Sequence, residues 1–236
     1  MCFYNSNSKK ATDLENRYGR KADFSDIVKQ NIEEQYKISA FTFPDCAIIT
    51  SSDTVQTAKW GLIPSWTKTE NDAQKIRKMT LNARAETSFS MPSFRVPILQ
   101  KRCLVVSTGY FEFHHEGKTV SPYFIFLKNE EIFSLGGMYE IWLNPITKNT
   151  LQTFTVLTVT ANELCEKIHN GGKNPFRMPL IIDKENEGHW LDNSLNINEI
   201  KYFMNSYDSN KMDAYRISQD FLKKNPKDAS ILQPAA

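Results

Sequence analysis

Hydrophobic positions along the chain form two kinds of pattern. Four segments have the spacing and capping signals of short helices: residues 9–20, 25–37, 161–170 and 195–206. Six other runs are rich in β-branched and aromatic residues and are predicted to be strands: residues 46–51, 54–63, 102–113, 122–128, 131–142 and 153–161. Turn-forming residues separate these runs, as between the strands of an antiparallel sheet.

Many short strands with a few helices between them predict an α+β fold. We expect a single domain with a largely antiparallel, barrel-like β-sheet core and several flanking helices. No composition break marks a linker, so residues 1–225 are assigned to one domain. Residues 226–236 form a polar tail that we expect to be poorly ordered.

Composition narrows the classes of protein without selecting one. The 236 residues are 40% hydrophobic and 24% charged, which is ordinary for a globular protein. Neither a membrane-spanning run nor the apolar region of a secretory signal is visible, so we expect a cytoplasmic protein with no membrane association. The net charge of +2 neither requires nor excludes a nucleic-acid partner.

Cysteine spacing gives no sign of a metal site. The four cysteines, Cys2, Cys46, Cys103 and Cys165, are scattered, and no C-x-x-C pair occurs. This pattern argues against structural zinc and against a disulfide framework, and we expect neither a metal nor a cofactor. Cys2 differs from the others in position. If Met1 is removed, Cys2 carries a thiol and a free α-amine on adjacent carbons.

Several blocks combine polar groups with rigid backbone, although each has a simpler reading by itself. Two tryptophans flank a turn in residues 60–66, and they fit a core as well as a binding surface. Polar residues 82, 84 and 86 fit a solvated face. Glu112 lies between two phenylalanines in a strand, so it points to the opposite face, toward either water or a pocket. A lone histidine such as His169 is more often structural than catalytic.

Taken together and in order, these blocks resemble the SRAP (SOS-response-associated peptidase) family. The resemblance extends from residue 2 to about residue 192. It is carried by Met1-Cys2, Trp60-Gly61-Leu62-Ile63-Pro64, Asn82-Ala83-Arg84-Ala85-Glu86, Arg102-Cys103-Leu104 through Glu112, Thr158 through Asn162, His169, and Arg177-Met178-Pro179.

The resemblance implies a DNA-repair protein that binds single-stranded DNA and crosslinks covalently to abasic sites through Cys2. The chemistry requires both groups of an N-terminal cysteine. The amine forms a Schiff base with the ring-opened sugar aldehyde, and the thiol then closes a thiazolidine by an intramolecular addition. Met1 must therefore be removed, and the resemblance includes removal by the protein itself. A lyase-type activity and a self-peptidase activity are expected.

By resemblance, the catalytic residues are Cys2, Asn82, Glu112 and His169. Glu112 and His169 would transfer protons, and Asn82 would orient the nucleophile and the sugar. Arg84 and Arg177 would hold phosphates. The apolar residues expected to contact bases are Trp60, Ile63, Pro64, Trp66, Met178 and Pro179.

Two departures from the family pattern bear on DNA binding. Family members commonly begin Met-Cys-Gly-Arg, whereas Phe3 and Tyr4 follow Cys2 here, which removes an arginine that contacts phosphate. A glycine-rich insert, residues 170–176, separates His169 from Arg177 and is expected to be a flexible loop. Its Lys173 is a candidate phosphate contact.

Other functions remain open at the level of sequence. A cysteine-dependent peptidase would use Cys2, His169 and Asn82 as nucleophile, base and orienting residue, but it gives no reason for a cysteine at position two. A DNA-binding module with a decayed site is the third alternative. We expect a monomer whose substrate is single-stranded DNA containing abasic sites. Replication-fork proteins are further candidate partners.

Overall fold

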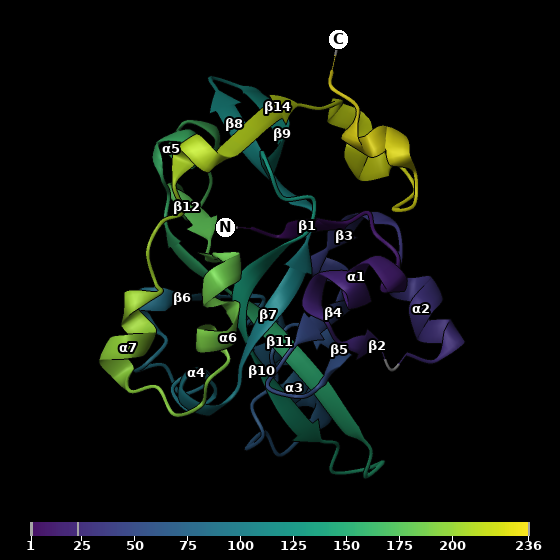
Figure 1. The fold of residues 1–236 in the computed structure, drawn as a ribbon, viewed down its shortest axis with the longest axis vertical. Helices are drawn as coiled ribbons and strands as arrows, with labels where there is room; N and C mark the ends of the chain where they lie inside the picture. The colour runs from purple at the N-terminus through teal and green to yellow at the C-terminus, as the bar shows by residue number, and fades with distance from the viewer. Residues whose placement is uncertain (1, 23, 236) are drawn as a thin grey trace.

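Five strands close into a barrel in the computed structural model, which describes residues 2–22 and 24–235 (Figure 1). In order around the barrel they are β5 (Thr54–Trp60), β4 (Asp45–Ile49), β7 (Arg102–Ser107), β10 (Phe133–Leu143) and β11 (Thr150–Thr160). Neighbours are antiparallel except β11 and β5, which pair in parallel and close the ring. A ring with an odd number of strands cannot alternate direction throughout, so one parallel pair is required.

Short strands extend the barrel at its edges. They are β2 (Lys21–Ala22) beside β5, β6 (Asn82–Arg84) and β12 (Arg177–Pro179) beside β11, and β13 (Ile181–Ile182) beside β10. A second, antiparallel sheet has the order β14 (Met212–Arg216), β9 (Thr119–Leu127), β8 (Gly109–Glu116), β1 (Tyr4–Asn7) and β3 (Gln35–Ser39). The predicted α+β fold with a barrel-like core is confirmed.

The long apolar run predicted at residues 102–113 is two strands that belong to different sheets. β7 lies in the barrel, and β8 begins at Gly109 and continues into the second sheet. Gly109 has a φ of +154°, and a Cβ there would overlap the ring of Phe124 on the neighbouring strand β9. Glycine therefore permits the change of direction that carries Glu112 out of the barrel.

The seven α-helices in the described residues lie around the two sheets. They are α1 (Ala11–Tyr18), α2 (Asp26–Ile32), α3 (Glu70–Met79), α4 (Pro97–Gln100), α5 (Glu163–Ile168), α6 (Glu187–Trp190) and α7 (Ile197–Tyr202). All four predicted helices are present but shorter than expected, and α3, α4 and α6 were not predicted.

The prediction of helix through residues 33–37 was wrong. The chain leaves α2 after Ile32, Glu34 adopts a positive φ of 50°, and Gln35–Ser39 becomes β3 beside β1. Ile38 is then buried in the main core. Strand pairing and burial outweigh the helix propensity of these residues, which is a weak preference.

The C-terminal segment is packed onto the second sheet. Lys37 of β3 donates its Nζ protons to the carbonyls of Phe221, Leu222 and Lys224 at 3.1, 2.7 and 2.8 Å. In the described part of the polar tail, a short 3₁₀ helix buries Ile231, which is 1% exposed. The tail thus forms ordered contacts, and a domain boundary at residue 225 stays a prediction.

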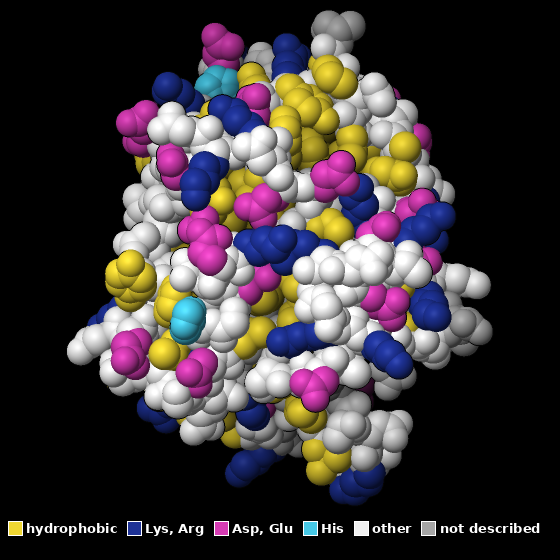
Figure 2. Space-filling model, in the orientation of Figure 1, with side chains coloured by type: hydrophobic (Ala, Val, Ile, Leu, Met, Phe, Trp, Pro, Cys, Tyr) yellow, Lys and Arg dark blue, Asp and Glu magenta, His cyan; other side chains and the backbone are white. Residues whose placement is uncertain are grey.

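Charges are mixed over the face seen in Figure 2. Basic and acidic side chains alternate across it, and hydrophobic side chains gather in its upper part, beside β14 and the C-terminal segment. No single-sign surface dominates this view, in agreement with the small net charge of +2.

Candidate functional site

Cys2 lies in the interior, just before β1. Tyr4 pairs with Phe111 in the antiparallel register of β1 and β8, and this register carries the residues before Tyr4 along β8 toward Glu112. Cys2 is 0% exposed, and its Sγ donates to the carbonyl of Tyr4 at 3.6 Å. Met1, whose removal is expected from the sequence, lies outside the described residues.

Asn82 binds the main chain of Cys2. Its Nδ2 donates to the Cys2 carbonyl at 2.9 Å, and its Oδ1 is buried without a hydrogen-bond partner in the described part of the chain. Parallel pairing of β6 with β11 positions Asn82. Trp60 holds the preceding residue, because its Nε1 donates to the carbonyl of Leu81 at 2.7 Å. Asn82 therefore presents a fixed, unused acceptor beside Cys2.

Glu112 points away from its aromatic neighbours and into the molecule. Phe111 and Phe113 pack around Phe221 in a separate aromatic cluster, whereas the side chain of Glu112 approaches His169. Glu112 is 3% exposed and His169 is 7% exposed. Their Oε2 and Nε2 atoms lie 3.8 Å apart. Of the two orientations that the sequence left open, the structure has the one that faces a pocket.

The ring orientation of His169 is fixed from its other side. His169 follows α5, whose N-cap residue Asn162 accepts a hydrogen bond from the main chain of Cys165 at 2.9 Å. The Nδ1 of His169 lies 2.9 Å from the carbonyl oxygen of Arg177. Since a carbonyl only accepts, Nδ1 carries the proton and the neutral ring presents the lone pair of Nε2 to Glu112.

Burial shifts the protonation of the three titratable groups. It raises the pKa of Glu112 to about 7 and lowers the pKa of His169 to about 4. Burial, with a further contribution from Glu112, raises the pKa of the Cys2 thiol well above its ordinary range. Near neutral pH, His169 is uncharged, the thiol is protonated and Glu112 exchanges protons readily. Glu112 can therefore both accept and donate a proton at neutral pH, as a general acid–base catalyst must.

A cavity of about 500 Å³, here called the reaction pocket, opens beside these groups. It is lined by Phe3, Tyr4, Phe111, Glu112, Phe113, His115, Val120, His169, Gly171, Gly172, Lys173 and Asn174. Phe113, His115 and Val120 were not predicted from the sequence as site residues. Polar and apolar residues alternate along β8 and β9, and this alternation could have indicated which residues share a face with Glu112. It does so only when the pairing of the two strands is known.

The two predicted phosphate-binding arginines have different surroundings. Arg84 is exposed and donates to Asn174 Oδ1 at 2.5 Å. Arg177 is 8% exposed and makes a bidentate pair with Glu86 at 2.6 and 2.9 Å, and its Nη2 also donates to the Thr158 carbonyl at 2.6 Å. Arg84 is available to a ligand at the surface, whereas Arg177 is held by its own chain.

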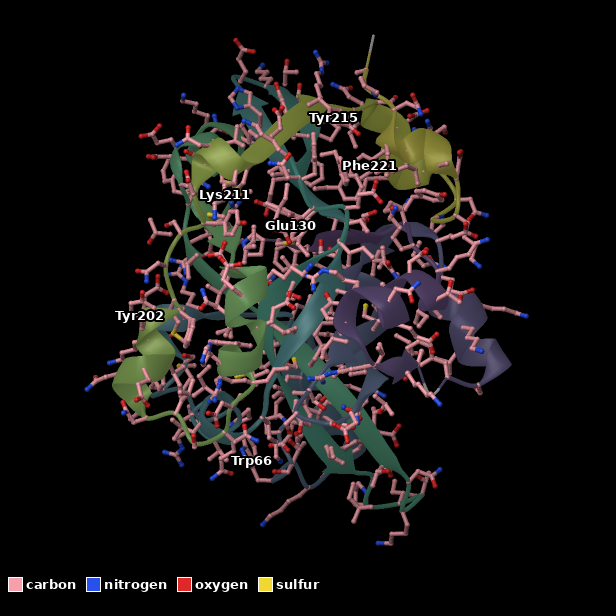
Figure 3. The ribbon with its side chains drawn as sticks, viewed as in Figure 1. Trp66, Glu130, Tyr202, Lys211, Tyr215 and Phe221 are labelled. Atoms are coloured by element: carbon pink, nitrogen blue, oxygen red, sulfur yellow. The ribbon has the colours of Figure 1, made fainter. Side chains whose placement is uncertain are left out.

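Most of the residues predicted to contact bases are buried. Five of the six are in this class: Trp60, Ile63, Pro64, Met178 and Pro179. Trp66 is 53% exposed, and Figure 3 shows it at the lower end of the molecule, away from β1. The structure does not bring these residues together around the reaction pocket, and their contact with bases stays a prediction.

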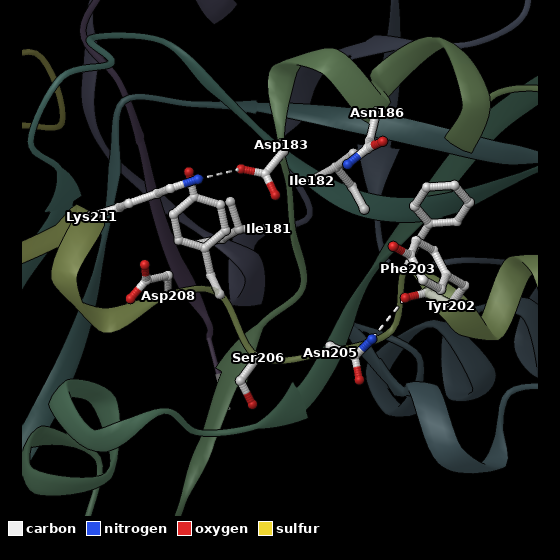
Figure 4. A pocket seen from close by; sticks show the side chains of 11 residues that line it. Ile181, Ile182, Asp183, Asn186, Tyr202, Phe203, Asn205, Ser206, Asp208 and Lys211 are labelled. Carbon is white, nitrogen blue, oxygen red and sulfur yellow. Dashed lines mark hydrogen bonds and ion pairs between the residues drawn. The ribbon is translucent and has the colours of Figure 1, made fainter.

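A second cavity of about 360 Å³ lies beside β13 and α7 (Figure 4). Asp183 and Lys211 form an ion pair of 3.1 Å within it, and no predicted site residue lines it. Across residues 2–22 and 24–235, no three His, Cys, Asp or Glu side chains gather in a metal-binding group. In the same residues, no helix has the length and apolar character needed to cross a membrane.

Sequence comparisons match this chain to one protein family. The family described as SOS response associated peptidase (SRAP) matches residues 1–223. The abasic site processing protein YoqW of Bacillus subtilis is 36% identical over 222 residues, which cover 89% of this chain and 93% of that protein. The abasic site processing protein HMCES of Gallus gallus is 33% identical over 154 residues, or 57% of this chain and 44% of that protein.

Solved structures agree with the sequence comparisons. A crystal structure of a protein from Bacteroides thetaiotaomicron superimposes with a TM-score of 0.96 at 50% identity and covers 100% of both chains. A second, from Bordetella bronchiseptica, has a TM-score of 0.79 at 19% identity over 92% of this chain and 100% of that one, and shows the likeness of fold alone. The match along almost the entire chain establishes that this protein belongs to the SRAP family.

Proposed function

We propose that this protein processes abasic sites in single-stranded DNA by forming a covalent crosslink through Cys2. The observation that carries the proposal is a chain of contacts: Asn82 holds the main chain of the buried Cys2, the charge of Glu112 acts on the Cys2 thiol, and Glu112 faces His169 in the reaction pocket. The relatives named as abasic site processing proteins support the substrate. A cysteine at position two is explained only if its α-amine takes part.

The reaction begins after hydrolysis of the bond between Met1 and Cys2. The Cys2 amine adds its lone pair to the aldehyde carbon of the ring-opened sugar and gives a carbinolamine. Loss of water then gives a Schiff base. The thiol sulfur adds to the imine carbon, and its proton ends on the nitrogen. The ring of nitrogen, two cysteine carbons, sulfur and sugar carbon is a thiazolidine, and one water is released overall.

Protonation favours amine-first chemistry. An α-amine titrates near ~7.7–8.0, so a useful fraction is unprotonated at neutral pH. The pKa of the thiol is raised by burial, so the thiol enters as a protonated group that needs a base. Glu112, with a pKa of about 7, accepts protons from the nucleophile and returns one to the departing water.

His169 and Asn82 act on the sugar in this proposal. The 3.8 Å between Glu112 and His169 is too long for a direct hydrogen bond, but a hydroxyl lying between them can bond to both. Because Nδ1 of His169 bonds to the Arg177 carbonyl, Nε2 is the ring atom that accepts the hydroxyl proton when the sugar ring opens. The buried Oδ1 of Asn82 accepts a hydrogen bond from the Cys2 amine or from a hydroxyl of the sugar.

The peptidase alternative, with His169 oriented by Asn82, is not favoured by the geometry. The Nδ1 of His169 bonds to the Arg177 carbonyl, and Asn82 bonds to the main chain of Cys2. Nucleophilic cysteines are usually activated by a lowered thiol pKa, and here the shift has the opposite sign. Removal of Met1 by the protein itself belongs to the proposal as a separate, single-turnover step.

A denaturing gel tests the crosslink. Protein of verified intact mass, lacking Met1, is incubated with a labelled single-stranded oligonucleotide that contains one abasic site. We expect a band of lower mobility that survives denaturation and is absent with Cys2→Ala. A full-strength band from Cys2→Ala, or no band with wild-type protein, would refute the proposal. Cys46→Ala is the matched control, because Cys46 is also buried but lies in the barrel strand β4.

Intact-mass measurement tests the removal of Met1. The wild type and Glu112→Gln are synthesised in a translation system lacking methionine aminopeptidase. Self-processing predicts loss of Met1 from the wild type and its retention in the variant. Retention in both assigns the removal to another enzyme. The proposal also takes the protein to be a monomer in the cytoplasm, which size-exclusion chromatography and fractionation of the native host check.

A further inference from the structure

We propose that the outer part of the reaction pocket binds the nucleobase of the nucleotide next to the abasic site. This outer part, here called the side pocket, is bounded by Phe3, Phe113, Val120 and residues 171–174. The inference rests on the proposed function, since it concerns the DNA strand that delivers the reacting sugar. The protein would then bind the neighbouring base in addition to the abasic sugar.

The size and lining of the cavity exceed what a baseless sugar needs. A volume of about 500 Å³ lies within the range of pockets that hold whole small ligands. A ring-opened deoxyribose is small and polar, and its chemistry involves Glu112 and His169. Beyond those two groups the walls are mainly aromatic and apolar. A nucleobase matches that lining, because its flat faces stack on aromatic rings.

The aromatic wall is already formed in the absence of DNA. The ring of Phe3 lies 4.9 Å from that of Phe41, and the ring of Tyr4 lies 5.9 Å from that of Phe113. Tyr4 also contacts Phe41 with their centroids 6.0 Å apart. Rings that support one another lose little conformational freedom when a base stacks on them. Phe41 remains 54% exposed, so the wall continues outward to the surface.

The glycine-rich insert forms the opposite wall and is fastened to β8. Asn170 accepts from the main-chain N–H of His115 at 2.8 Å and donates to the His115 carbonyl at 3.0 Å. Gly171 packs so closely on His115 that a Cβ would overlap the imidazole ring. At the other end of the loop, Arg84 bonds to Asn174. The insert, which the sequence suggested to be flexible, holds the side pocket open through these contacts.

Charge and continuity identify the occupant. Lys173 lines the pocket from the insert, and Arg84 reaches the same loop, so two cations lie beside an apolar cavity. A nucleotide has this combination of an anionic phosphodiester and an apolar face. The side pocket is continuous with Glu112 and His169, so its occupant must lie next to the reacting sugar. The neighbouring nucleotide of the same strand is the group that the substrate always brings there.

Single-turnover crosslinking tests the proposal. The substrates are single-stranded oligonucleotides with one abasic site whose 5′ neighbour, 3′ neighbour or both carry either a normal base or tetrahydrofuran, a stable sugar analogue without a base. We expect wild-type protein to react about tenfold more slowly when the base on one particular side is missing, a ratio within the range of stacking on aromatic side chains. Equal rates on all substrates would overturn the proposal.

A variant that fills the side pocket locates the effect. Val120→Trp is expected to react with every substrate at the rate of the slow, baseless-neighbour substrate. Ile141→Trp is the matched control, because Val120 and Ile141 are strand residues of similar exposure, 42% and 46%, and Ile141 lies on β10, outside the pocket. Thermal melting verifies that both variants fold.

The outcomes separate this inference from the proposed function. Retention of the full preference for a neighbouring base in Val120→Trp, or its loss in Ile141→Trp, would overturn the assignment to the side pocket. If Val120→Trp does not fold, Phe3→Ala replaces it and is expected to reduce the same preference. Absence of crosslinking on every substrate would refute the proposed function, whereas crosslinking without any effect of the neighbouring base refutes only the side pocket.

Discussion

The reaction pocket and the lower end of the barrel around Trp66 are both rich in aromatic side chains, and each has a buried carboxylate beside them. At the lower end, Glu140 is 2% exposed and forms an ion pair with Lys101, and Ser65 Oγ donates to it at 3.2 Å. In the reaction pocket, Glu112 is equally buried but faces an uncharged His169 beside a cavity. One carboxylate forms an ion pair with a lysine, and the other faces an imidazole.

The partner of each carboxylate explains why two regions of similar composition have different roles. The ion pair of the buried Glu140 with Lys101 holds neighbouring segments in place. A buried carboxylate beside a neutral imidazole has its pKa raised by burial, here to about 7, and can exchange protons. The indole nitrogens near the lower end likewise bind main-chain carbonyls, as Trp142 Nε1 does with Thr67 at 2.8 Å. Trp60, in the tryptophan block of the sequence, donates to the carbonyl of Leu81 at 2.7 Å in the same way, so its indole serves the packing of the barrel.

Replacing each carboxylate by its amide tests this comparison most strongly. Glu112→Gln is expected to slow crosslinking by about 10³-fold, within the usual range for loss of a general acid or base. Glu140→Gln is expected to leave the rate unchanged and to lower the free energy of unfolding by about 2 kcal/mol, because Lys101 loses its charged partner. Single-turnover gels and urea denaturation measure the two effects. An equal loss of rate in both variants would remove the distinction.

The same pair predicts opposite changes in stability with pH. The carboxyl of Glu112 titrates at about 7 when folded and near ~4.3 when unfolded, so the native state is penalised as pH rises through 7. Glu112→Gln removes that penalty and is expected to melt at a higher temperature than wild type at pH 8. At pH 4 the two proteins should melt alike, because the carboxyl is then largely protonated in both states. Melting curves showing a less stable variant at pH 8 would contradict a raised pKa.

Changing His169 separates proton transfer from structure within the pocket. His169→Gln is expected to slow the reaction by about 10²-fold, because it removes the lone pair at Nε2 that faces Glu112. Glu112 and the Cys2 amine titrate near neutral pH in both proteins, so the ratio of the wild-type rate to the His169→Gln rate isolates the histidine. Burial lowers the pKa of His169 to about 4, so this ratio should stay constant from pH 7 to pH 5 and fall as the pH drops through 4, when the ring becomes protonated. Rates of both proteins from pH 3.5 to 7 provide the measurement, and a ratio that already falls near pH 6.5 would indicate an unperturbed histidine.

The two arginines are expected to differ in their effect on DNA binding. Arg84→Ala should reduce the salt dependence of binding to single-stranded DNA by about 0.7 in the logarithmic slope, because one phosphate contact is lost. Arg177→Ala should leave the slope unchanged and destabilise the fold by about 2 kcal/mol, since Glu86 and Thr158 hold this side chain. Fluorescence anisotropy at several salt concentrations measures the slope for each variant. Equal changes in slope would support the phosphate contact predicted for Arg177.

Truncating Trp66 gives the smallest expected effect. Its side chain is 53% exposed and lies away from the reaction pocket, so Trp66→Ala should change the free energy of unfolding by about 0.5 kcal/mol or less. Crosslinking should proceed at the wild-type rate. A loss of tenfold or more in rate would show that DNA extends to the lower end of the barrel and that the predicted base contact of Trp66 is correct.

Local pattern was sufficient to predict the six strand-forming runs, the four helices and the α+β class, because these depend on the spacing of apolar residues along the chain. The family resemblance predicted Cys2, Asn82, Glu112 and His169 as catalytic residues; their catalytic roles stay a prediction, and the structure places Asn82 on Cys2 and Glu112 beside His169. The resemblance also grouped Arg84 with Arg177 and Trp66 with Trp60, since residue type and order do not report burial.

Tertiary structure decided what each of these residues faces. Pairing of β1 with β8 directs Cys2 toward Glu112, and the glycine at position 109 moves β8 out of the barrel into a second sheet. The ion pair with Glu86 occupies the guanidinium of Arg177. The close contact of Gly171 with His115 fixes the glycine-rich insert against β8, where it lines the reaction pocket. Sequence determined which groups are present, whereas their distances and burial come from contacts between residues far apart in the chain, and those contacts set the protonation on which the chemistry depends.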